Sequence, residues 1–347
     1  MSHASVCIVG AGAIGGYLAV RLARAGHRVT VVARGAQLEA IRRNGLTLIA
    51  ASGESETIAP TRATADLREA GPQDVVIVAV KAHQLAPLAA GLDAVFHAHT
   101  VLVPMQNGIP WWYFQRHGGP FEGRAVTSVD PDGTLARTID PKRIVGCVVY
   151  PATALERPGV VRHVEGNRFP VGELDGNTTV RAQRVSELFI GAGLKSPVLP
   201  DIRSEIWLKL WGNLSFNPIS AVTGATLAHI CRYPHTRALA AGMMREAAAV
   251  ANELGVTFRV PLEHRIAGAE KVGEHKTSML QDIEAGRATE IDALLGSVIE
   301  LARLTGTAVP QLEAVYACAK LRSLVALHAH RETGEKPNPP VAAAMTG

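Results

Sequence analysis

The sequence predicts an α/β domain with a mainly parallel sheet over residues 1–200, followed by an all-helical domain over residues 201–330. The chain has 347 residues, more than a single hydrophobic core usually serves. Short β-rich runs alternate with glycine turns and helical patterns in the first half, whereas nearly every segment from residue 203 onward has helical periodicity. Residues 331–347 are proline-rich and weakly patterned, so we expect a loose tail there.

A glycine motif follows the first predicted strand. Residues 6–9 form a short apolar run, as in a strand buried on both faces of a parallel sheet. A G-x-G-x-x-G turn comes next, then a helix through residue 25 and a second strand over residues 28–33. In this strand–turn–helix–strand setting the motif predicts a Rossmann-type dinucleotide site. The expected cofactor-binding residues of the turn are Gly10, Ala11, Gly12, Ala13, Ile14 and Gly15.

Each glycine of the motif has an expected physical role. Gly10 permits the tight turn, Gly12 lets a pyrophosphate approach the backbone, and Gly15 lets the helix pack closely on the strand. The N-terminus of the helix then offers free N–H donors and a partial positive charge to the phosphates.

The end of the second strand favours NADP over NAD. A site that prefers NAD usually has Asp or Glu here to accept hydrogen bonds from the ribose 2′-hydroxyl. This chain has Arg34 and Gly35 instead, and its next acid is Glu39. A guanidinium can bind a 2′-phosphate, whereas a carboxylate would repel it, so we expect NADPH or NADP+. The alternative is that Arg34 is an ordinary surface arginine.

Two later strands, over residues 74–80 and 100–105, end in polar side chains. Lys81 and Gln84 follow the first of them, and Asn107 follows the second. Ligands of open α/β sheets bind beyond the carboxyl ends of the strands, so we expect these three residues near the nicotinamide ribose or the substrate. Taken singly, each is equally well read as an ordinary loop residue.

Two rows of side chains run along a predicted helix over residues 205–220. An apolar row with helical spacing is made by Trp207, Leu210, Trp211 and Leu214. A polar row repeats every four residues and holds Lys209, Asn213 and Asn217. At about 100° per residue the polar row lies roughly a quarter-turn from the apolar one, so its members should be half-buried. Pro218 disfavours a helical conformation for the residue before it, so we expect a break that points the Asn217 amide inward.

The ordered segments resemble the ketopantoate reductase (2-dehydropantoate 2-reductase) family over roughly residues 5–325. The matching motifs are GAGAIGG, VKAHQ, QNG, W-x-K-L-x-x-N-x-x-x-N-P and TSMLQDIEAGRATEID. The resemblance implies an NADPH-dependent reduction of 2-dehydropantoate, a small anionic 2-oxo acid, to (R)-pantoate for pantothenate and coenzyme A biosynthesis. It also implies a site in the cleft between the Rossmann-type and helical domains.

The resemblance also implies roles for individual residues. Lys209 would be the proton donor, Asn213 and Asn217 would touch the substrate, and Ser278 would bind on the substrate's carboxylate side. Glu290 would face the cofactor and the reacting hydroxyl, Asn107 would contact both ligands, and Arg34 and Lys81 would bind NADPH. The chemistry agrees, because negative charge grows on the keto oxygen during hydride addition and a positioned acid should supply a proton. Partial desolvation would lower the pKa of the Lys209 amine toward a useful value.

Bland alternatives stay open for these side chains. Lys209 could be a lysine whose stem covers the edge of the core, and the two asparagines could be structural hydrogen bonders. Glu290 could be favoured at a helix start by the helix dipole alone, and Ser278 could merely open its helix.

The substrate side departs from the family pattern. His275 replaces a common asparagine, the region near Leu227 lacks a common polar residue, and aromatic residues 111–114 are expected at the cleft mouth. The segment over residues 121–165 is longer than usual. A reductase of another 2-oxo acid with the same mechanism is therefore the alternative function, and a non-catalytic NADP(H) sensor is a third.

Composition argues against several other classes of protein. The net charge of +4 comes from dispersed basic residues, which predicts no nucleic-acid partner. No apolar run is long enough for a membrane span, and no basic region precedes an apolar stretch at the N-terminus, so we expect a cytoplasmic protein without a secretory signal. The four cysteines are far apart and are expected to be buried and reduced. The histidines do not have the spacing of a zinc site, so we expect no bound metal. A homodimer is left open.

Overall fold

The β-rich runs of the first half form a five-stranded parallel sheet in the order β5–β2–β1–β6–β7. Its strands are β1 (Ser5–Val9), β2 (Arg28–Val32), β5 (Arg62–Thr64), β6 (Val75–Val78) and β7 (Val101–Pro104). The central strand β1 is buried from Val6 to Val9, as expected for a strand covered on both faces. The predicted parallel α/β fold is confirmed, and because the strands are parallel their carboxyl ends share one edge.

The computed structural model describes residues 3–333, which divide into two units. The first unit comprises residues 3–106, 111–125 and 132–202. The second comprises residues 107–110, 126–131 and the described chain from residue 203 onward. The expected loose tail lies outside the described residues from residue 334 onward.

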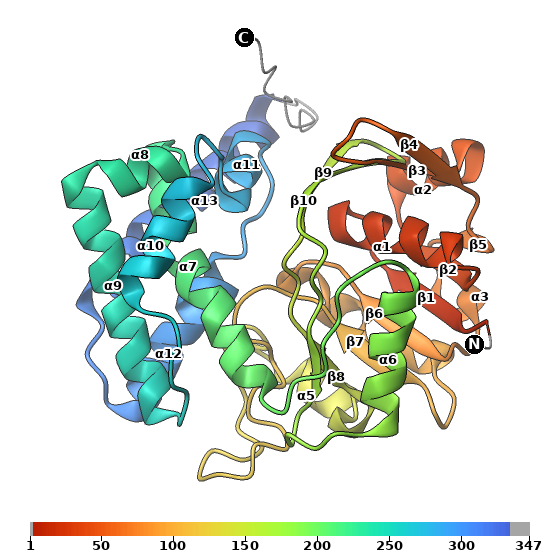
Figure 1. Ribbon diagram of the computed structural model, residues 1–347, viewed down its shortest axis with the longest axis horizontal. Helices are drawn as coiled ribbons and strands as arrows, with labels where there is room; N and C mark the ends of the chain where they lie inside the picture. Colours follow the sequence, from red (N-terminus) through yellow and green to blue (C-terminus); the bar gives the residue numbers. More distant parts are fainter. Residues whose placement is uncertain (1–2, 334–347) are drawn as a thin grey trace. The chain divides into compact units, whose positions relative to one another are not determined.

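Helix α1 (Ala13–Arg24) is buried on most of its surface because sheets cover it on two sides. It contacts β1 and β2 of the parallel sheet and also β3, β9 and β10 of a second sheet (Figure 1). The second sheet has the order β4–β3–β10–β9. Its strands are β3 (Leu46–Ile49), β4 (Ser55–Ile58), β9 (Ala152–Arg157) and β10 (Val160–Glu165).

Shorter elements complete the first unit. A two-stranded ladder joins β8 (Val145–Cys147) to β11 (Val171–Glu173). The other helices are α2 (Gly35–Asn44), α3 (Leu67–Ala70), η1 (Ala82–Gln84), α4 (Ala86–Ala89), η2 (Leu92–Val95), α5 (Thr134–Thr138), η3 (Pro141–Arg143) and α6 (Val180–Gly191).

Aromatic residues 111–114 belong to the core of the first unit. The sequence-based expectation placed them at a cleft mouth, but none is more than 4% exposed. Gly146 on β8 leaves the room for one of them, because a Cβ there would lie 2.9 Å from Cη2 of Trp112. The expectation was wrong because large apolar rings gain more by leaving water than by lining an open surface.

The described part of the second unit is built from helices, which confirms the predicted all-helical region. They are α7 (Ile202–Thr223), α8 (Leu227–Arg232), α9 (Pro234–Glu253), α10 (Leu262–Lys271), α11 (Ser278–Glu284), the π-helical turn η4 (Asp292–Gly296), α12 (Ser297–Thr305) and α13 (Pro310–Thr333). Helix α9 contacts α8, α10, α12 and α13, so it forms the centre of this unit.

The apolar row of α7 is buried as predicted. Its four members are at most 3% exposed. Trp211 stacks on Phe258 with a centroid separation of 4.2 Å, and its indole N–H donates to the carbonyl of Met244 at 2.6 Å. The ring is therefore both packed and hydrogen-bonded, which fixes the rotation of α7 about its axis.

Helix α7 continues through Pro218 without the expected break at Asn217. A proline inside a helix removes one backbone hydrogen bond and usually kinks or ends the helix. Here every residue from 214 to 221 is buried, so packing around the helix outweighs the lost hydrogen bond. The prediction from the local sequence was wrong because it took no account of tertiary burial.

The cysteines agree with the expectation except at one position. Cys7, Cys147 and Cys231 are buried, and burial raises the pKa of the Cys7 thiol to about 12. Cys318 is exposed on α13, contrary to the expectation. Within residues 3–333, no helix has the length and apolar character needed to cross a membrane.

Within the second unit, a carboxylate of α12 binds the loop over residues 126–131. Glu300 on α12 accepts hydrogen bonds from the backbone N–H and hydroxyl of Thr127, both at 2.8 Å. Ser128 donates in the same way, at 2.7 Å from its N–H and 2.6 Å from its hydroxyl. Burial by itself would raise the pKa of Glu300, but these hydrogen bonds outweigh it and hold the pKa below its usual value.

We predict that Glu300→Gln lowers the free energy of unfolding by about 1–2 kcal/mol at pH 7, because a neutral amide cannot accept all four hydrogen bonds. The folded-state pKa is depressed, so the contribution of Glu300 is complete above the unfolded-state pKa of about 4.3 and is lost as the pH falls through the folded-state value. Urea unfolding between pH 3 and pH 7 should therefore show that the difference in unfolding free energy between the wild type and Glu300→Gln becomes smaller as the pH falls.

The matched control is Glu253→Gln, which makes the same chemical change at an exposed position on α9. Its unfolding free energy should stay within about 0.5 kcal/mol of the wild type. Equal effects of the two substitutions would show that Glu300 has no special anchoring role.

Candidate active site

The glycine turn after β1 has the sterics that its motif predicts. Gly10 has a φ of +99°, and a Cβ there would lie 2.6 Å from Cγ1 of Val80. A Cβ on Gly15 would lie 1.9 Å from the carbonyl oxygen of Gly10, so only glycine lets α1 approach the strand this closely. A Cβ on Gly12 would meet nothing within 4 Å, which leaves that side of the turn open. Gly10 and Gly15 are thus required by close packing, whereas Gly12 faces open space.

The same turn can accept an anion. Gly12 is the N-cap of α1, no side chain caps the helix, and its first turn contains no acid. The free N–H groups at such a helix start carry partial positive charge and favour phosphate. Gln37 braces the turn, because its amide donates to the carbonyl of Ala11 at 2.5 Å and accepts from the N–H of Gly159 at 2.9 Å. The sequence pattern contained no signal for this role of Gln37.

The other expected cofactor residues of the first unit lie at strand ends. Arg34 is exposed at the N-cap of α2, two residues beyond the end of β2. Lys81 is half-buried at the start of η1, and its backbone N–H donates to the side-chain oxygen of Gln84 at 3.2 Å. Gln84 is exposed, and by accepting this hydrogen bond its side chain also caps the start of η1. Gln106, which sequence reasoning did not single out, donates to the carbonyls of both Val78 and Val80 at 3.0 Å.

Three predicted site residues meet within the second unit. The side-chain amide of Asn107 donates to Oε2 of Glu290 at 2.9 Å, and the amine of Lys209 donates to Oδ1 of Asn107 at 2.6 Å. The two contacts assign the amide orientation, since its NH₂ group faces the carboxylate and its oxygen faces the ammonium. Asn107 therefore bridges a cation and an anion that come from distant parts of the sequence.

The polar row of α7 has the predicted intermediate burial at two of its three positions, and the prediction was wrong for Asn217. Lys209 and Asn213 are half-buried, whereas Asn217 is only 8% exposed. The stem of Lys209 passes the edge of the apolar row, and its amine reaches Asn107. This arrangement places an amine and two neutral amides in line along one side of the helix.

The remaining predicted substrate residue, Ser278, is exposed at the first position of α11. Thr277 caps that helix instead, because its hydroxyl accepts from the N–H of Leu280 at 3.3 Å. Ser278 is thus not required as a cap. Two of the departures from the family pattern, at His275 and Leu227, are joined by a 3.0 Å hydrogen bond from the N–H of Leu227 to the carbonyl of His275.

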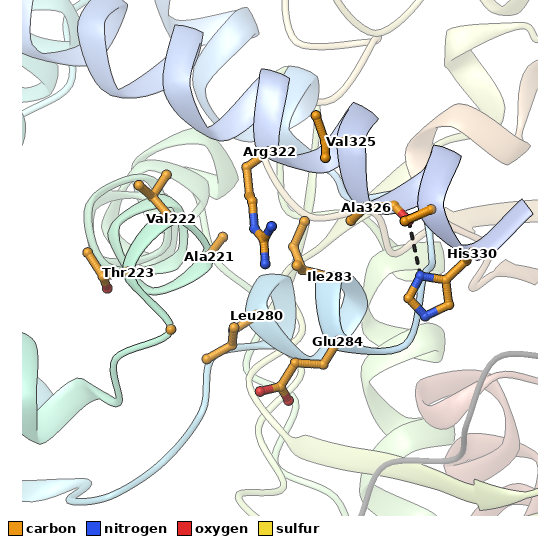
Figure 2. A pocket seen from close by; sticks show the side chains of 12 residues that line it. Ala221, Val222, Thr223, Leu280, Ile283, Glu284, Arg322, Val325, Ala326 and His330 are labelled. Atoms are coloured by element: carbon orange, nitrogen blue, oxygen red, sulfur yellow. Dashed lines mark hydrogen bonds between the residues drawn. The ribbon is translucent and has the colours of Figure 1, made fainter. Parts of the chain in front are cut away.

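A separate cavity of about 410 Å³ lies between the end of α7, α11 and α13 (Figure 2). Its lining includes Ala221, Leu280, Ile283, Arg322 and His330, and His330 donates from Nδ1 to the carbonyl of Ala326 at 3.0 Å. Ala221 lies twelve residues beyond Lys209 on α7, which corresponds to about 18 Å along the helix. None of the predicted site residues lines this cavity, so it is distinct from the surroundings of the Lys209 amine.

Comparisons with known proteins identify the family of the chain. Residues 6–176 match the family described as ketopantoate reductase PanE/ApbA, and residues 201–323 match the family of its C-terminal part. A 2-dehydropantoate 2-reductase of Mesorhizobium japonicum is 54% identical over 91% of this chain and 96% of its own length. One from Archaeoglobus fulgidus is 30% identical over 85% of this chain and 90% of its own length.

A solved structure gives the same result. A protein of Ralstonia solanacearum MolK2, assigned to the ketopantoate reductases, is 41% identical and superposes with a TM-score of 0.89. The match covers 94% of this chain and 99% of that one. The chain belongs to the ketopantoate reductase family, which confirms the resemblance drawn from its motifs.

The glycine turn generates a prediction about stability. We expect Gly15→Ala to lower the free energy of unfolding by at least about 2 kcal/mol, because the new methyl group would overlap the Gly10 carbonyl. Gly12→Ala should change it by less than about 1 kcal/mol, since the methyl group would enter open space. Denaturant unfolding of the two variants measures the difference, and similar losses for both would contradict the distinct roles assigned to the two glycines.

Proposed function

We propose that the protein reduces 2-dehydropantoate to (R)-pantoate with NADPH, in the pathway to pantothenate and coenzyme A in the cytoplasm. The observation that carries this proposal is the Lys209–Asn107–Glu290 bridge, found in a chain 54% identical to a 2-dehydropantoate 2-reductase. The reaction needs a hydride for the keto carbon, a proton for its oxygen and a site that tolerates an anionic substrate.

Lys209 is the proposed proton donor. As negative charge develops on the keto oxygen, its ammonium supplies both a proton and a nearby positive charge. The carbonyl of Asn107 accepts from this ammonium at 2.6 Å and so restricts where the amine points. Glu290 binds the other end of the Asn107 amide and fixes the direction in which that carbonyl faces. A fixed donor direction is what a proton transfer of this kind requires.

The neighbouring polar groups are proposed to bind the substrate. Asn213 and Asn217 follow Lys209 at successive turns of α7 and offer hydrogen bonds without adding a competing charge. Ser278 is exposed and is proposed to bind on the carboxylate side of the substrate. Glu290 and Asn107 are proposed to face the reacting hydroxyl and the cofactor.

The first unit provides residues that suit NADPH. A bound reduced nicotinamide nucleotide supplies the hydride. The open face at Gly12 and the free N–H groups of α1 fit a pyrophosphate, and the exposed guanidinium of Arg34 after β2 fits a 2′-phosphate. The proposed cofactor contacts of this unit are Gly10, Ala11, Gly12, Ala13, Ile14, Gly15, Arg34, Lys81 and Gln84. Asn107 and Glu290 of the second unit are proposed as further contacts.

The proposal is tested by steady-state assays with NADPH and a panel of 2-oxo acids that includes 2-dehydropantoate and bulkier aromatic acids. We expect 2-dehydropantoate to have the highest kcat/KM of the panel. If the enzyme reduced another 2-oxo acid and not 2-dehydropantoate, the proposed substrate would be wrong and the proposed mechanism would stand. NADPH binding without turnover of any acid would indicate a non-catalytic sensor.

We predict that Lys209→Ala lowers kcat by about a hundredfold or more, because the reaction then lacks its general acid. NADPH affinity should change little, since the proposed nucleotide phosphates bind at the glycine turn. The control is Lys271→Ala, which removes an exposed lysine of α10 and should leave kcat unchanged. An unaltered rate in Lys209→Ala would remove that residue from the mechanism.

We predict that Arg34→Asp weakens NADPH binding strongly and NADH binding slightly, because only NADPH carries the 2′-phosphate that the guanidinium would bind. Fluorescence titration with each nucleotide measures the two dissociation constants. Arg43→Asp makes the same charge change at an exposed position of α2 and serves as the control. Equal losses for NADPH and NADH in Arg34→Asp would contradict the assignment.

A further inference from the structure

A π-helical turn, η4, begins two residues after Glu290 and contains a backbone carbonyl that accepts two further hydrogen bonds. The N–H of Ile109 donates to the carbonyl of Ala293 at 3.1 Å, and the hydroxyl of Ser297 donates to the same oxygen at 2.7 Å. A π-helical turn offsets the regular hydrogen-bond ladder, and such turns occur frequently at functional sites. Here a carbonyl of the turn binds the loop that contains Asn107.

Gly108 makes this docking possible. Its φ is +86°, and a Cβ there would lie only 1.9 Å from the carbonyl oxygen of Ala293. Both the conformation and the space therefore require glycine. Because Asn107 is the preceding residue, the close approach of Gly108 to η4 sets where the Asn107 amide lies beside Glu290.

One face of α13 holds the segment on both sides of Glu290. Tyr316 donates its hydroxyl to Oδ1 of Asp292 at 2.8 Å, and Lys320 donates to Oδ2 of the same carboxylate at 2.6 Å. Ser323 accepts a 3.0 Å hydrogen bond from the buried hydroxyl of Thr289. Residues 316, 320 and 323 have the i, i+4, i+7 spacing of a single helix face. Thr289, directly before Glu290, and Asp292, two residues after it, are thus both attached to α13.

The hydroxyl of Tyr316 remains a hydrogen-bond donor to Asp292 at neutral pH. Burial, the hydrogen bond to Asp292 and the charge of that carboxylate raise the pKa of Tyr316 to about 12. The phenol therefore stays protonated and continues to donate.

We propose that Tyr316, Lys320 and Ser323 are positioning residues that set the geometry of the Lys209–Asn107–Glu290 bridge from outside it. Their side chains bind Thr289 and Asp292, and these two residues fix Glu290 and η4. The carbonyl of Ala293 in η4 in turn binds the loop that contains Asn107. The inference rests on the proposed function, because the bridge matters for the rate only if Lys209 is the proton donor. The described hydrogen bonds of these three side chains go to Thr289 and Asp292.

The Lys320–Asp292 pair is suited to a test, because its side chains are 36% and 42% exposed. Partly exposed ion pairs contribute little to folding stability. A small displacement of catalytic groups, in contrast, can lower a rate substantially. Loss of this pair should therefore affect the rate more than the melting temperature.

The experiment compares Lys320→Met with Arg322→Met, which removes an exposed cation two residues further along the same helix. We expect kcat, expressed per NADPH-binding site, to fall roughly tenfold or more in Lys320→Met and to stay within about twofold in Arg322→Met. Lys320→Arg should restore most of the rate, because its guanidinium can again pair with Asp292. Tyr316→Phe, which keeps the ring and removes the hydroxyl, should lower kcat in the same direction.

The outcomes separate positioning from folding and from the proposed function. An unchanged kcat in both Lys320→Met and Tyr316→Phe overturns the inference, as does a loss of activity that only follows a loss of NADPH-binding sites. If the wild type reduces no 2-oxo acid, the proposed function fails instead. The side-chain amide resonances of Asn107, observed with ¹⁵N-asparagine labelling, then decide the inference: they should shift in Lys320→Met and not in Arg322→Met, and an unshifted signal overturns it.

Discussion

The contact on which the proposed site depends is the amide of Asn107 between the amine of Lys209 and the carboxylate of Glu290. An amide has a donor end and an acceptor end, so it can bind a carboxylate with one and an ammonium with the other. Replacing it by a charged side chain would satisfy one neighbour and repel the other. The bridge therefore fixes the direction of the amine while both charges stay satisfied.

Close backbone approaches that only glycine permits also position the groups of the proposed site. Gly15 lets the first helix approach its strand, and Gly108 lets a loop approach the carbonyl of Ala293. In each case a single methyl group would lie 1.9 Å from a carbonyl oxygen, far inside the van der Waals limit. Gly12 is different because its missing side chain leaves open space, as a binding surface for phosphate requires. The same residue type thus serves packing at two positions and access at a third.

In the second unit, groups on helices bind short loop segments through several hydrogen bonds to the same acceptor. Glu300 binds Thr127 and Ser128 through backbone and hydroxyl donors, and the carbonyl of Ala293 binds the N–H of Ile109. Both anchors use a group on a helix to fix a loop that is distant in the sequence. Helices and strands hold functional groups more accurately than loops do. The contacts with helical residues therefore restrict the position of a loop residue such as Asn107.

The sequence by itself determined the parallel α/β region, the helical region, the glycine turn and the apolar row of α7, because each depends on a local pattern that tertiary contacts reinforce. Local reasoning failed at Pro218 and at aromatic residues 111–114, where burial outweighed the local preference. Only the tertiary structure decided that Asn107 joins Lys209 to Glu290, that Gln37 braces the glycine turn, and that α13 holds the segment around Glu290. These contacts join residues from distant parts of the chain, and no periodicity along a sequence records which distant groups a fold brings together.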